Sequence, residues 1–148
     1  MLDRTAVGRS TAGTLNEVEA GAIRRFAASV GDTSPLSFDT KAARDAGYDD
    51  VVAPPTFPVT FSSGADLREV LGVPVRHLLL AEQTWEYARP IVAGDRLTVK
   101  AKVADITERS SPAGRVEVAV ISEEGLDAQG RVVFRGRRTY VVRAVREG

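Results

Sequence analysis

Residues 86–99 read EYARPIVAGDRLTV, and they join two stretches that have the composition of β-strands. Residues 78–88 and 96–107 are rich in Val, Leu, Thr, Tyr and Trp, and they partly alternate between apolar and polar side chains. This pattern is typical of strands, and the AGD cluster between them is typical of a turn. We therefore predict two long strands with a turn between them.

The same composition continues toward the C-terminus. Residues 115–123 and 131–143 repeat it, and the clusters SPAG and DAQG separate the successive stretches. Turn clusters of Gly, Pro, Asp and Ser between such stretches favour consecutive antiparallel strands. The second half of the chain therefore predicts four long strands joined as an antiparallel meander.

The first half of the chain has a helical period instead. Within residues 18–30, apolar side chains recur at three- and four-residue spacings, so they lie along one stripe of a helix, which Gly31 ends. Asp39 suits the N-cap of a second helix over residues 40–46, which Gly47 closes. We therefore expect two helices in the first third of the chain.

A third helical run follows the prolines at 54 and 55 and stops near Gly72. Its apolar positions are Phe57, Phe61, Ala65 and Leu67. Three helical segments followed by four strands predict an α+β domain in which one antiparallel β-sheet wraps around a central α-helix. At 148 residues, the chain has the length of one domain, which we place at residues 1–148.

The composition excludes several function classes. Lys and Arg number 20, and Asp and Glu also number 20, so no net field attracts nucleic acid or an anionic membrane. The chain has no cysteine, one histidine (His77) and no glycine-rich phosphate loop, so a metal or nucleotide site has no sequence support. It also shows no signal peptide and no apolar run near the roughly 20 residues of a membrane span. We therefore expect a cytoplasmic protein without metal or cofactor.

The order of these pieces resembles that of the MaoC-like hydratases and dehydratases, hot-dog proteins that act on acyl thioesters. Three segments carry the resemblance over nearly the whole chain: FAASVGDTSP at residues 26–35, VVAPPTF at residues 51–57, and residues 86–99. The APPTF string is similar to that of the FAS1-like dehydratase branch, which includes the substrate-binding subunit of heterodimeric (3R)-hydroxyacyl-carrier-protein dehydratases. The resemblance implies a hot-dog fold that pairs with another, as a homodimer or a heterodimer.

Two departures from the catalytic members of this family bear on activity. Their motif Gly-Asp-x-Asn-Pro-x-His grips a water between Asp and His, but here Asp32 is followed by Ser34 at the Asn position and Ser37 at the His position. A serine cannot exchange a proton near neutral pH as a histidine does. Catalytic members also carry His-Gly where this chain has Ala53 and Pro54, and proline has no N–H to stabilise an enolate oxygen.

These departures predict an acyl-thioester-binding, non-catalytic subunit of a (3R)-hydroxyacyl-thioester dehydratase. Such a hydro-lyase is active only when a catalytic MaoC-like partner joins it, and its ligand is the acyl chain of a coenzyme A or carrier-protein thioester. Asp32 and Ser37 are then remnants of a catalytic pair. The predicted substrate-binding residues are Ala53, Pro54, Pro55, Thr56, Phe57, Phe61 and Trp85.

Other interpretations stay open at this point. A homodimer in which Asp32 and Ser37 hold a water would be a slow hydratase or dehydratase, and Asp32 acting as a base would suit a hot-dog thioesterase. A stand-alone acyl-binding protein would show no turnover. Aspartate is also common after glycine as a plain turn residue, and this is the alternative interpretation of Asp32. Trp85 and Tyr87 share one face of a strand, where ordinary packing is an alternative to acyl contact, and His77 falls outside the catalytic motif.

Overall fold

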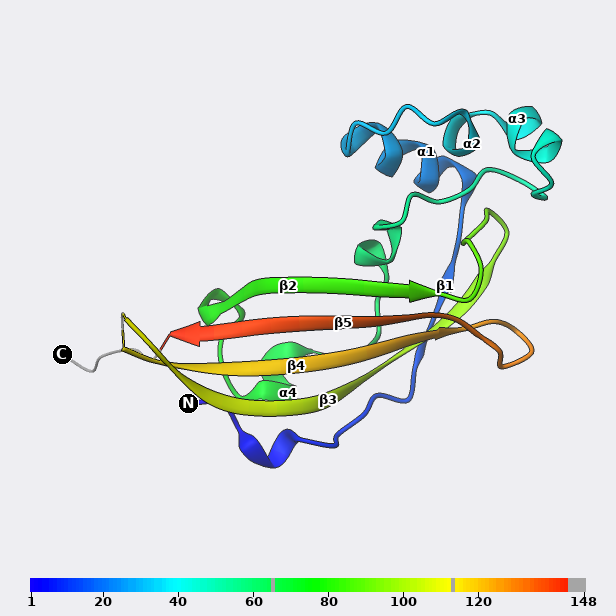
Figure 1. Cartoon of the computed structure of the whole chain (residues 1–148). Coiled ribbons are helices and arrows are strands. Elements are labelled where there is room, and N and C mark those ends of the chain that lie inside the picture. Colours follow the sequence, from blue (N-terminus) through cyan, green and yellow to red (C-terminus); the bar gives the residue numbers. More distant parts are fainter. Residues whose placement is uncertain (65, 113, 144–148) are drawn as a thin grey trace.

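The computed structural model describes residues 1–64, 66–112 and 114–143, which form an antiparallel five-stranded sheet with short helices. The strand order is β1-β3-β4-β5-β2. The strands are β1 (Thr14–Glu17), β2 (Leu78–Tyr87), β3 (Arg96–Ser111), β4 (Gly114–Leu126) and β5 (Val132–Arg143). Figure 1 shows β2, β5, β4 and β3 lying side by side as one long, curved sheet.

The four predicted strands are confirmed, but the predicted meander is wrong at its first step. β3, β4 and β5 pair in sequence, whereas β2 pairs with β5 and not with β3. The connection over residues 88–95 bonds to earlier parts of the chain: the Ala93 amide donates to the Val51 carbonyl, and the Gly94 amide donates to the Val18 carbonyl. It therefore acts as a crossover and not as a hairpin turn. β1, which the sequence pattern missed, is only four residues long and pairs with β3 at the other edge.

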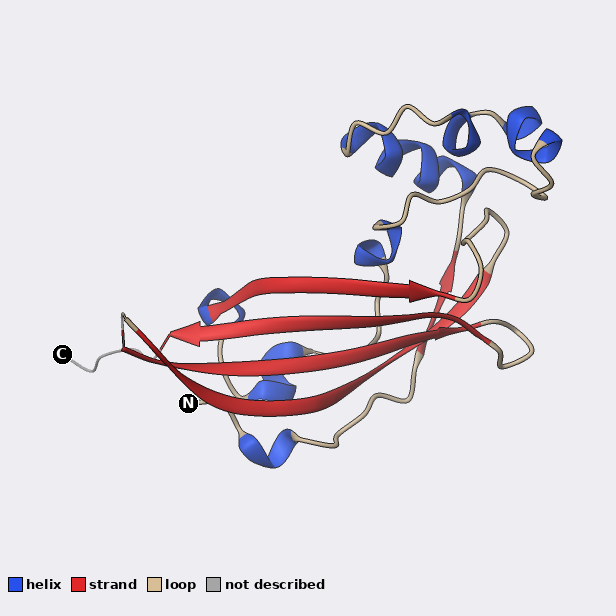
Figure 2. Ribbon diagram, in the orientation of Figure 1, coloured by secondary structure: helices blue, strands red, loops and turns tan. Residues whose placement is uncertain are grey.

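The helices occupy the first half of the chain. They are η1 (Arg4–Ala6), α1 (Ala20–Ser29), α2 (Pro35–Phe38), α3 (Thr40–Asp45), η2 (Phe57–Thr60), α4 (Leu67–Leu71) and η3 (Val75–His77). The first two predicted helices are confirmed as α1 and α3. Gly31, with a positive φ of 73°, follows α1, and the Asp39 carboxylate caps α3 by accepting from the Lys41 amide at 2.8 Å. Figures 1 and 2 show α1, α2 and α3 grouped beyond one end of the sheet.

The predicted third helix is wrong in its middle, because η2 and α4 are separate elements and Phe61 between them is extended. Ala65, one of its predicted apolar positions, lies outside the described residues. The side chain of Asn16 on β1 explains the break: its Oδ1 accepts from the Ser62 amide at 2.9 Å, and its Nδ2 donates to the Ser62 carbonyl at 2.8 Å. A backbone segment held to β1 in this way cannot continue a helical ladder.

The face of the sheet that carries α4 and η2, here called the inner face, holds two apolar clusters. The first cluster packs η1 and α4 against the sheet, and its buried members are Leu2, Ala6, Leu71, Val73, Ala101, Val103, Ile106, Ala119, Ile121, Tyr140 and Val142. The second packs α1 and η2 against the other end of β3 and β5, and its buried members are Val18, Ile23, Val51, Phe57, Ile91, Leu97, Val99, Val133 and Phe134. Gly125 on β4 makes room for one of these rings, because a Cβ there would stand 2.1 Å from Cε1 of Phe134.

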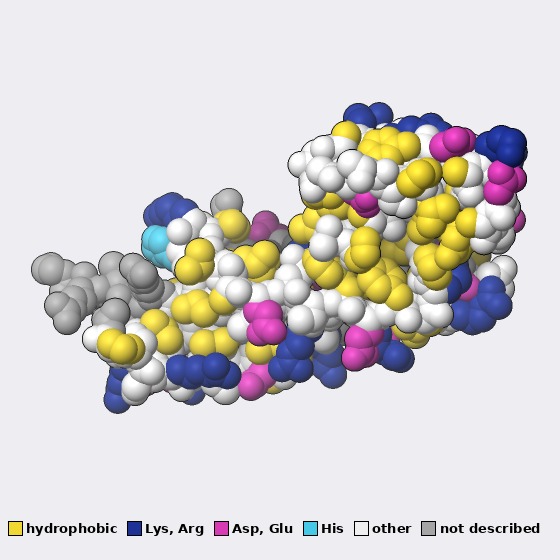
Figure 3. Space-filling view, turned by 45° about the horizontal axis from the view of Figure 1, so that its top comes forward, with side chains coloured by type: hydrophobic (Ala, Val, Ile, Leu, Met, Phe, Trp, Pro, Cys, Tyr) yellow, Lys and Arg dark blue, Asp and Glu magenta, His cyan; other side chains and the backbone are white. Residues whose placement is uncertain are grey.

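Hydrophobic side chains also gather at the surface where the layer of α1, α2 and α3 meets the sheet, as Figure 3 shows. Within the residues that the structure describes, no helix has both the length and the hydrophobicity needed to cross a lipid bilayer. The junction between the helical layer and the sheet therefore presents the exposed apolar surface that a binding site requires.

Candidate functional site

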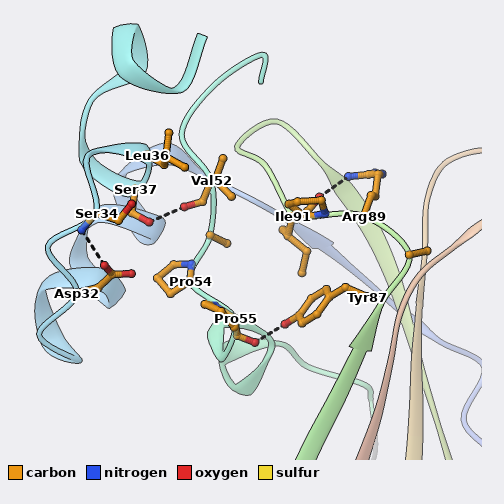
Figure 4. Close-up of a pocket in the computed structure, with 13 residues that line it drawn as sticks. Asp32, Ser34, Leu36, Ser37, Val52, Pro54, Pro55, Tyr87, Arg89 and Ile91 are labelled. Atoms are coloured by element: carbon orange, nitrogen blue, oxygen red, sulfur yellow. Dashed lines mark hydrogen bonds between the residues drawn. The ribbon is translucent and has the colours of Figure 1, made fainter. Parts of the chain in front are cut away.

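The pocket at this junction has a volume of about 480 Å³. Figure 4 shows it between the turn after α1, the short helix α2, the segment over residues 52–55 and the connection that leaves β2. Its lining residues are Asp32, Ser34, Leu36, Ser37, Val52, Ala53, Pro54, Pro55, Tyr87, Ala88, Arg89, Pro90 and Ile91. The fold thus gathers the three segments that carry sequence motifs around one cavity.

Asp32 stands at the turn between α1 and α2. Its amide donates to the Ala27 carbonyl at 2.9 Å, and its Oδ1 accepts from the Ser34 amide at 2.8 Å. These are the hydrogen bonds of an aspartate that forms a turn, which was one of the two interpretations of Asp32 in the sequence. The same carboxylate also lines the pocket and points toward the wall that carries Pro54 (Figure 4). The two roles are compatible, because a carboxylate has two oxygens and several acceptor sites.

Ser37 lies in the pocket wall with only 3% of its surface exposed. Its hydroxyl donates to the Val52 carbonyl at 2.7 Å, and the Val52 amide donates in turn to the Leu36 carbonyl at 2.8 Å. Ser37 therefore ties α2 to the segment over residues 52–55. Since its one hydrogen is used in this bond, the hydroxyl can meet a ligand or a water only as an acceptor.

The wall formed by residues 53–55 has no N–H to offer. The Ala53 amide donates to the Ile91 carbonyl at 2.8 Å, and Pro54 and Pro55 have no amide hydrogen. In this described segment, therefore, no backbone N–H is free to donate a hydrogen bond into the pocket.

Tyr87 is a pocket residue that the predicted site did not include. Its hydroxyl donates to the Pro55 carbonyl across the cavity (Figure 4). Burial raises the pKa of the Tyr87 hydroxyl to about 12, so this group stays protonated and neutral at physiological pH. The spacing of Trp85 and Tyr87 along one strand indicated a shared face, and the structure places Tyr87 at the pocket end of that face.

Arg89 is the second pocket residue that the predicted site omitted. Its Nη1 and Nη2 donate to the two carboxylate oxygens of Asp95 at 2.8 and 3.1 Å, and Asp95 also accepts from the Val92 amide at 2.9 Å. The hydrogen bond to Asp95 raises the pKa of Arg89 above its ordinary value, and the pair holds the crossover in shape. In the sequence, the Arg-Pro and Gly-Asp pairs within residues 86–99 were the signal that could have pointed to Arg89 and Asp95.

The structure separates the predicted site residues into two groups. Asp32, Ser37, Ala53, Pro54 and Pro55 line the pocket. In the described chain, the others lie outside its lining, and they are Thr56, Phe57, Phe61 and Trp85. Phe57 is buried in the second apolar cluster, and Phe61 and Trp85 pack against it. The structure therefore places the Trp85 side chain in ordinary packing, which was the alternative to acyl contact.

Ring contacts connect the pocket to this cluster. The ring centroids of Tyr87 and Phe134 are 6.2 Å apart, those of Phe134 and Phe61 are 5.9 Å apart, and those of Phe61 and Phe57 are 5.4 Å apart. Across the described ranges of the chain, no three His, Cys, Asp or Glu side chains come together as a metal site. The site is thus an apolar cavity with a few fixed polar groups at its rim.

Comparison with known proteins agrees with this architecture. Residues 5–135 match the model of the family described as FAS1-like, dehydratase domain region. The chain belongs to this family. It is also 38% identical over 152 residues to a UPF0336 protein of Streptomyces avermitilis, and the match covers 99% of each chain.

Solved structures extend the likeness to three dimensions. A MaoC-like dehydratase shares 28% identity and a TM-score of 0.82, with 96% of this chain and 43% of that chain covered. The C-terminally truncated HadBC (3R-hydroxyacyl-ACP dehydratase) complex of Mycobacterium tuberculosis contains a chain with 24% identity and a TM-score of 0.80, with 92% of this chain and 96% of that chain covered. The predicted hot-dog fold of the MaoC-like dehydratases is therefore confirmed.

Proposed function

We propose that the chain is the acyl-thioester-binding subunit of a cytoplasmic (3R)-hydroxyacyl-thioester dehydratase, and that a catalytic MaoC-like partner supplies the acid–base residues. One observation carries this proposal: among the described lining residues, there is no histidine beside Asp32, and residues 53–55 leave no free N–H. Hydration of an enoyl thioester needs a proton carrier near neutral pH and a donor to the enolate oxygen. A subunit without either contributes by holding the ligand.

The pocket lining supports an acyl ligand. Leu36, Val52 and Ile91 offer apolar contact, whereas Tyr87 and Arg89 bring polar groups that are already hydrogen-bonded. A cavity of about 480 Å³ lies within the usual range for small-molecule sites. A coenzyme A thioester and a carrier-protein thioester present the same acyl group to such a cavity, so both belong to the proposed ligand class.

The free edge of β2 supports a partner subunit. β2 is an edge strand, ten residues long, and Leu79 and Leu80 on it are 62% and 44% exposed. The unpaired backbone groups of such an edge, together with exposed leucines, form a template for pairing with another chain. The HadBC complex, whose chain shares this fold, is an assembly of two different subunits by name. We place a catalytic hot-dog partner on the β2 edge.

The test compares the chain alone with the chain in complex. We expect at most trace hydration of crotonyl-coenzyme A by the purified chain, and rapid hydration after co-expression with a MaoC-like protein of the same organism that carries an intact Asp and His. Calorimetric titration of the isolated chain with the same thioester should show binding without turnover. A turnover rate of about 1–10³ per second for the chain alone would overturn the proposal.

A second candidate function, a homodimeric hydratase, rests on the position of the Asp32 carboxylate in the pocket wall. If this function operates, Asp32→Asn abolishes any activity of the chain alone. Asp45→Asn is the matched control, because Asp45 is an exposed carboxylate on α3 that does not line the pocket. Equal residual activity in both variants would remove this candidate.

A further inference from the structure

Tyr87 stands at the boundary between the 480 Å³ pocket and the second apolar cluster. It lines the pocket, and its side chain also packs against that cluster. Ala53 and Ile91 share this double position. In the described chain, four rings of the cluster stay outside the pocket lining, and they are Phe26, Phe57, Phe61 and Phe134. Three residues thus stand between the pocket and these rings.

Two of these three residues are fixed to each other by the backbone, because the Ala53 amide donates to the Ile91 carbonyl at 2.8 Å. Tyr87 differs, since it reaches across the cavity with its side chain alone, and its hydroxyl donates to the Pro55 carbonyl (Figure 4). This contact joins the last residue of β2 to the segment over residues 52–55. The ring of Tyr87 is therefore the part of the boundary that a single side chain controls.

The surface behind the Tyr87 ring is apolar and aromatic. The ring centroid of Phe134 lies 6.2 Å from that of Tyr87, and the ring centroid of Phe61 follows at 5.9 Å from that of Phe134. Phe134 is fully buried. An apolar ligand chain gains free energy from each methylene that it removes from water, and these rings would continue that gain. What ends the pocket here is therefore the bulk of the Tyr87 ring and not a change to a polar wall.

We propose that the Tyr87 ring closes the acyl pocket toward the aromatic residues, and that it thereby sets the longest acyl group that the pocket can bury. The inference rests on the proposed acyl-binding function, which it deepens by naming the residue that determines specificity and the ligand class: acyl thioesters whose chain ends before this ring. Loss of the ring extends the pocket toward Phe134 and Phe61. The Pro55 carbonyl then loses its donor, but Pro55 is exposed, so water can replace the hydroxyl.

The experiment measures, by calorimetry, the affinity of the full chain for saturated acyl-coenzyme A thioesters from butyryl to dodecanoyl. Each methylene that becomes buried should tighten binding about fourfold, which corresponds to about 0.8 kcal/mol. We expect this rise in affinity to stop at one acyl length in the wild-type chain, because longer acyl groups meet the Tyr87 ring.

Tyr87→Ala should move this limit to a longer acyl group and leave the affinity for butyryl-coenzyme A unchanged. The fourfold gain per methylene should then continue past the wild-type limit. Tyr87→Phe should keep the limit, because it loses the hydrogen bond and retains the ring. If Tyr87→Ala does not fold, Tyr87→Val replaces it, since valine suits a strand.

Tyr48→Ala is the matched control, because within the described chain Tyr48 lies outside the pocket lining and outside both apolar clusters. This variant should keep the wild-type limit. A control that moved the limit as far as Tyr87→Ala does would overturn the assignment to Tyr87.

The remaining outcomes separate this inference from the proposed function. Wild-type affinity that rises steadily through dodecanoyl-coenzyme A, or a limit that Tyr87→Ala leaves in place, overturns the role of Tyr87 while acyl binding stands. A limit that moves equally in Tyr87→Phe overturns the assignment to the ring. Failure of every thioester to bind would instead count against the proposed function itself.

Discussion

Tyr87 shows how one side chain sets the chemistry of the pocket. Its hydroxyl bridges to the Pro55 carbonyl, and its ring faces Phe134, so the residue links the segment over residues 52–55 to the sheet. The raised pKa follows from burial and keeps the hydroxyl neutral. Sequence motifs predicted the pocket residues Asp32 and Ser37, because these stand at fixed positions in a motif. Tyr87 stands in the segment over residues 86–99, but the Arg-Pro and Gly-Asp pairs that mark this segment do not include it, and it reaches the cavity because it is the last residue of β2 before the crossover.

Titration of Tyr87 gives a first prediction. Its folded pKa of about 12 lies above the ordinary value of 10.0, so the protonated form contributes stability that is fully present below pH 10 and is lost as the pH rises toward 12. We expect tyrosinate absorbance to show a component near pH 12 that Tyr87→Phe removes. Tyr48→Phe is the control, and loss of the same component in that variant would contradict the assignment.

Gly125 gives a prediction about stability. Gly125→Ala places a methyl group 2.1 Å from the Phe134 ring, in a packed cluster, so we expect destabilisation of about 1–3 kcal/mol in chemical unfolding. Gly21→Ala is the control with the opposite sign, because Gly21 lies inside α1 and its nearest neighbour is the end of the flexible Arg25 side chain. Alanine there should stabilise by about 0.5–1 kcal/mol.

At the scale of elements, local pattern predicted the strands and the first helices well, because each extends over enough residues to show its period. The predicted third helix was wrong because Asn16, far away in the sequence, binds the backbone of Ser62. β1 was missed because four residues carry too little periodicity. The order of the strands was wrong because it depends on where residues 88–95 find hydrogen-bond partners, which no local pattern records.

The cap of α3 can be tested directly. Asp39→Ala removes the carboxylate that accepts from the Lys41 amide, and we expect a loss of about 1 kcal/mol in the free energy of unfolding. Asp45→Ala near the end of the same helix is the control, because its exposed ion pair with Lys41 is worth less than a cap. Equal effects of the two substitutions would argue against a capping role.

At the scale of the whole molecule, the sheet has two edges of different character. β1 at one edge is short, whereas β2 at the other edge is long and carries exposed leucines. The family resemblance predicted pairing of two hot-dog sheets, and the β2 edge is the surface that suits it. Pairing of two sheets along β2 would remove its exposed leucines and its unpaired backbone groups from water.

Light scattering tests this surface. We expect the chain to form dimers, with itself or with a partner, and Leu79→Glu to yield monomers that retain their circular dichroism spectrum, because Leu79 is 62% exposed. Leu15→Glu, at 49% exposure on the opposite edge strand, is the matched control and should leave the dimer intact. A dimer that survives Leu79→Glu and is lost with Leu15→Glu would move the interface to β1.

The division of the inner face into two apolar clusters has a dynamic consequence. α1 packs on only one of them, whereas β3 contributes buried residues to both, so the end of the molecule that holds the pocket can open while the remainder stays folded. Native-state hydrogen exchange should then show α1 amides exchanging through a partial opening and β3 amides exchanging only through global unfolding. Because the 480 Å³ pocket exists only while that end is closed, a bound acyl thioester would slow exchange in α1 first.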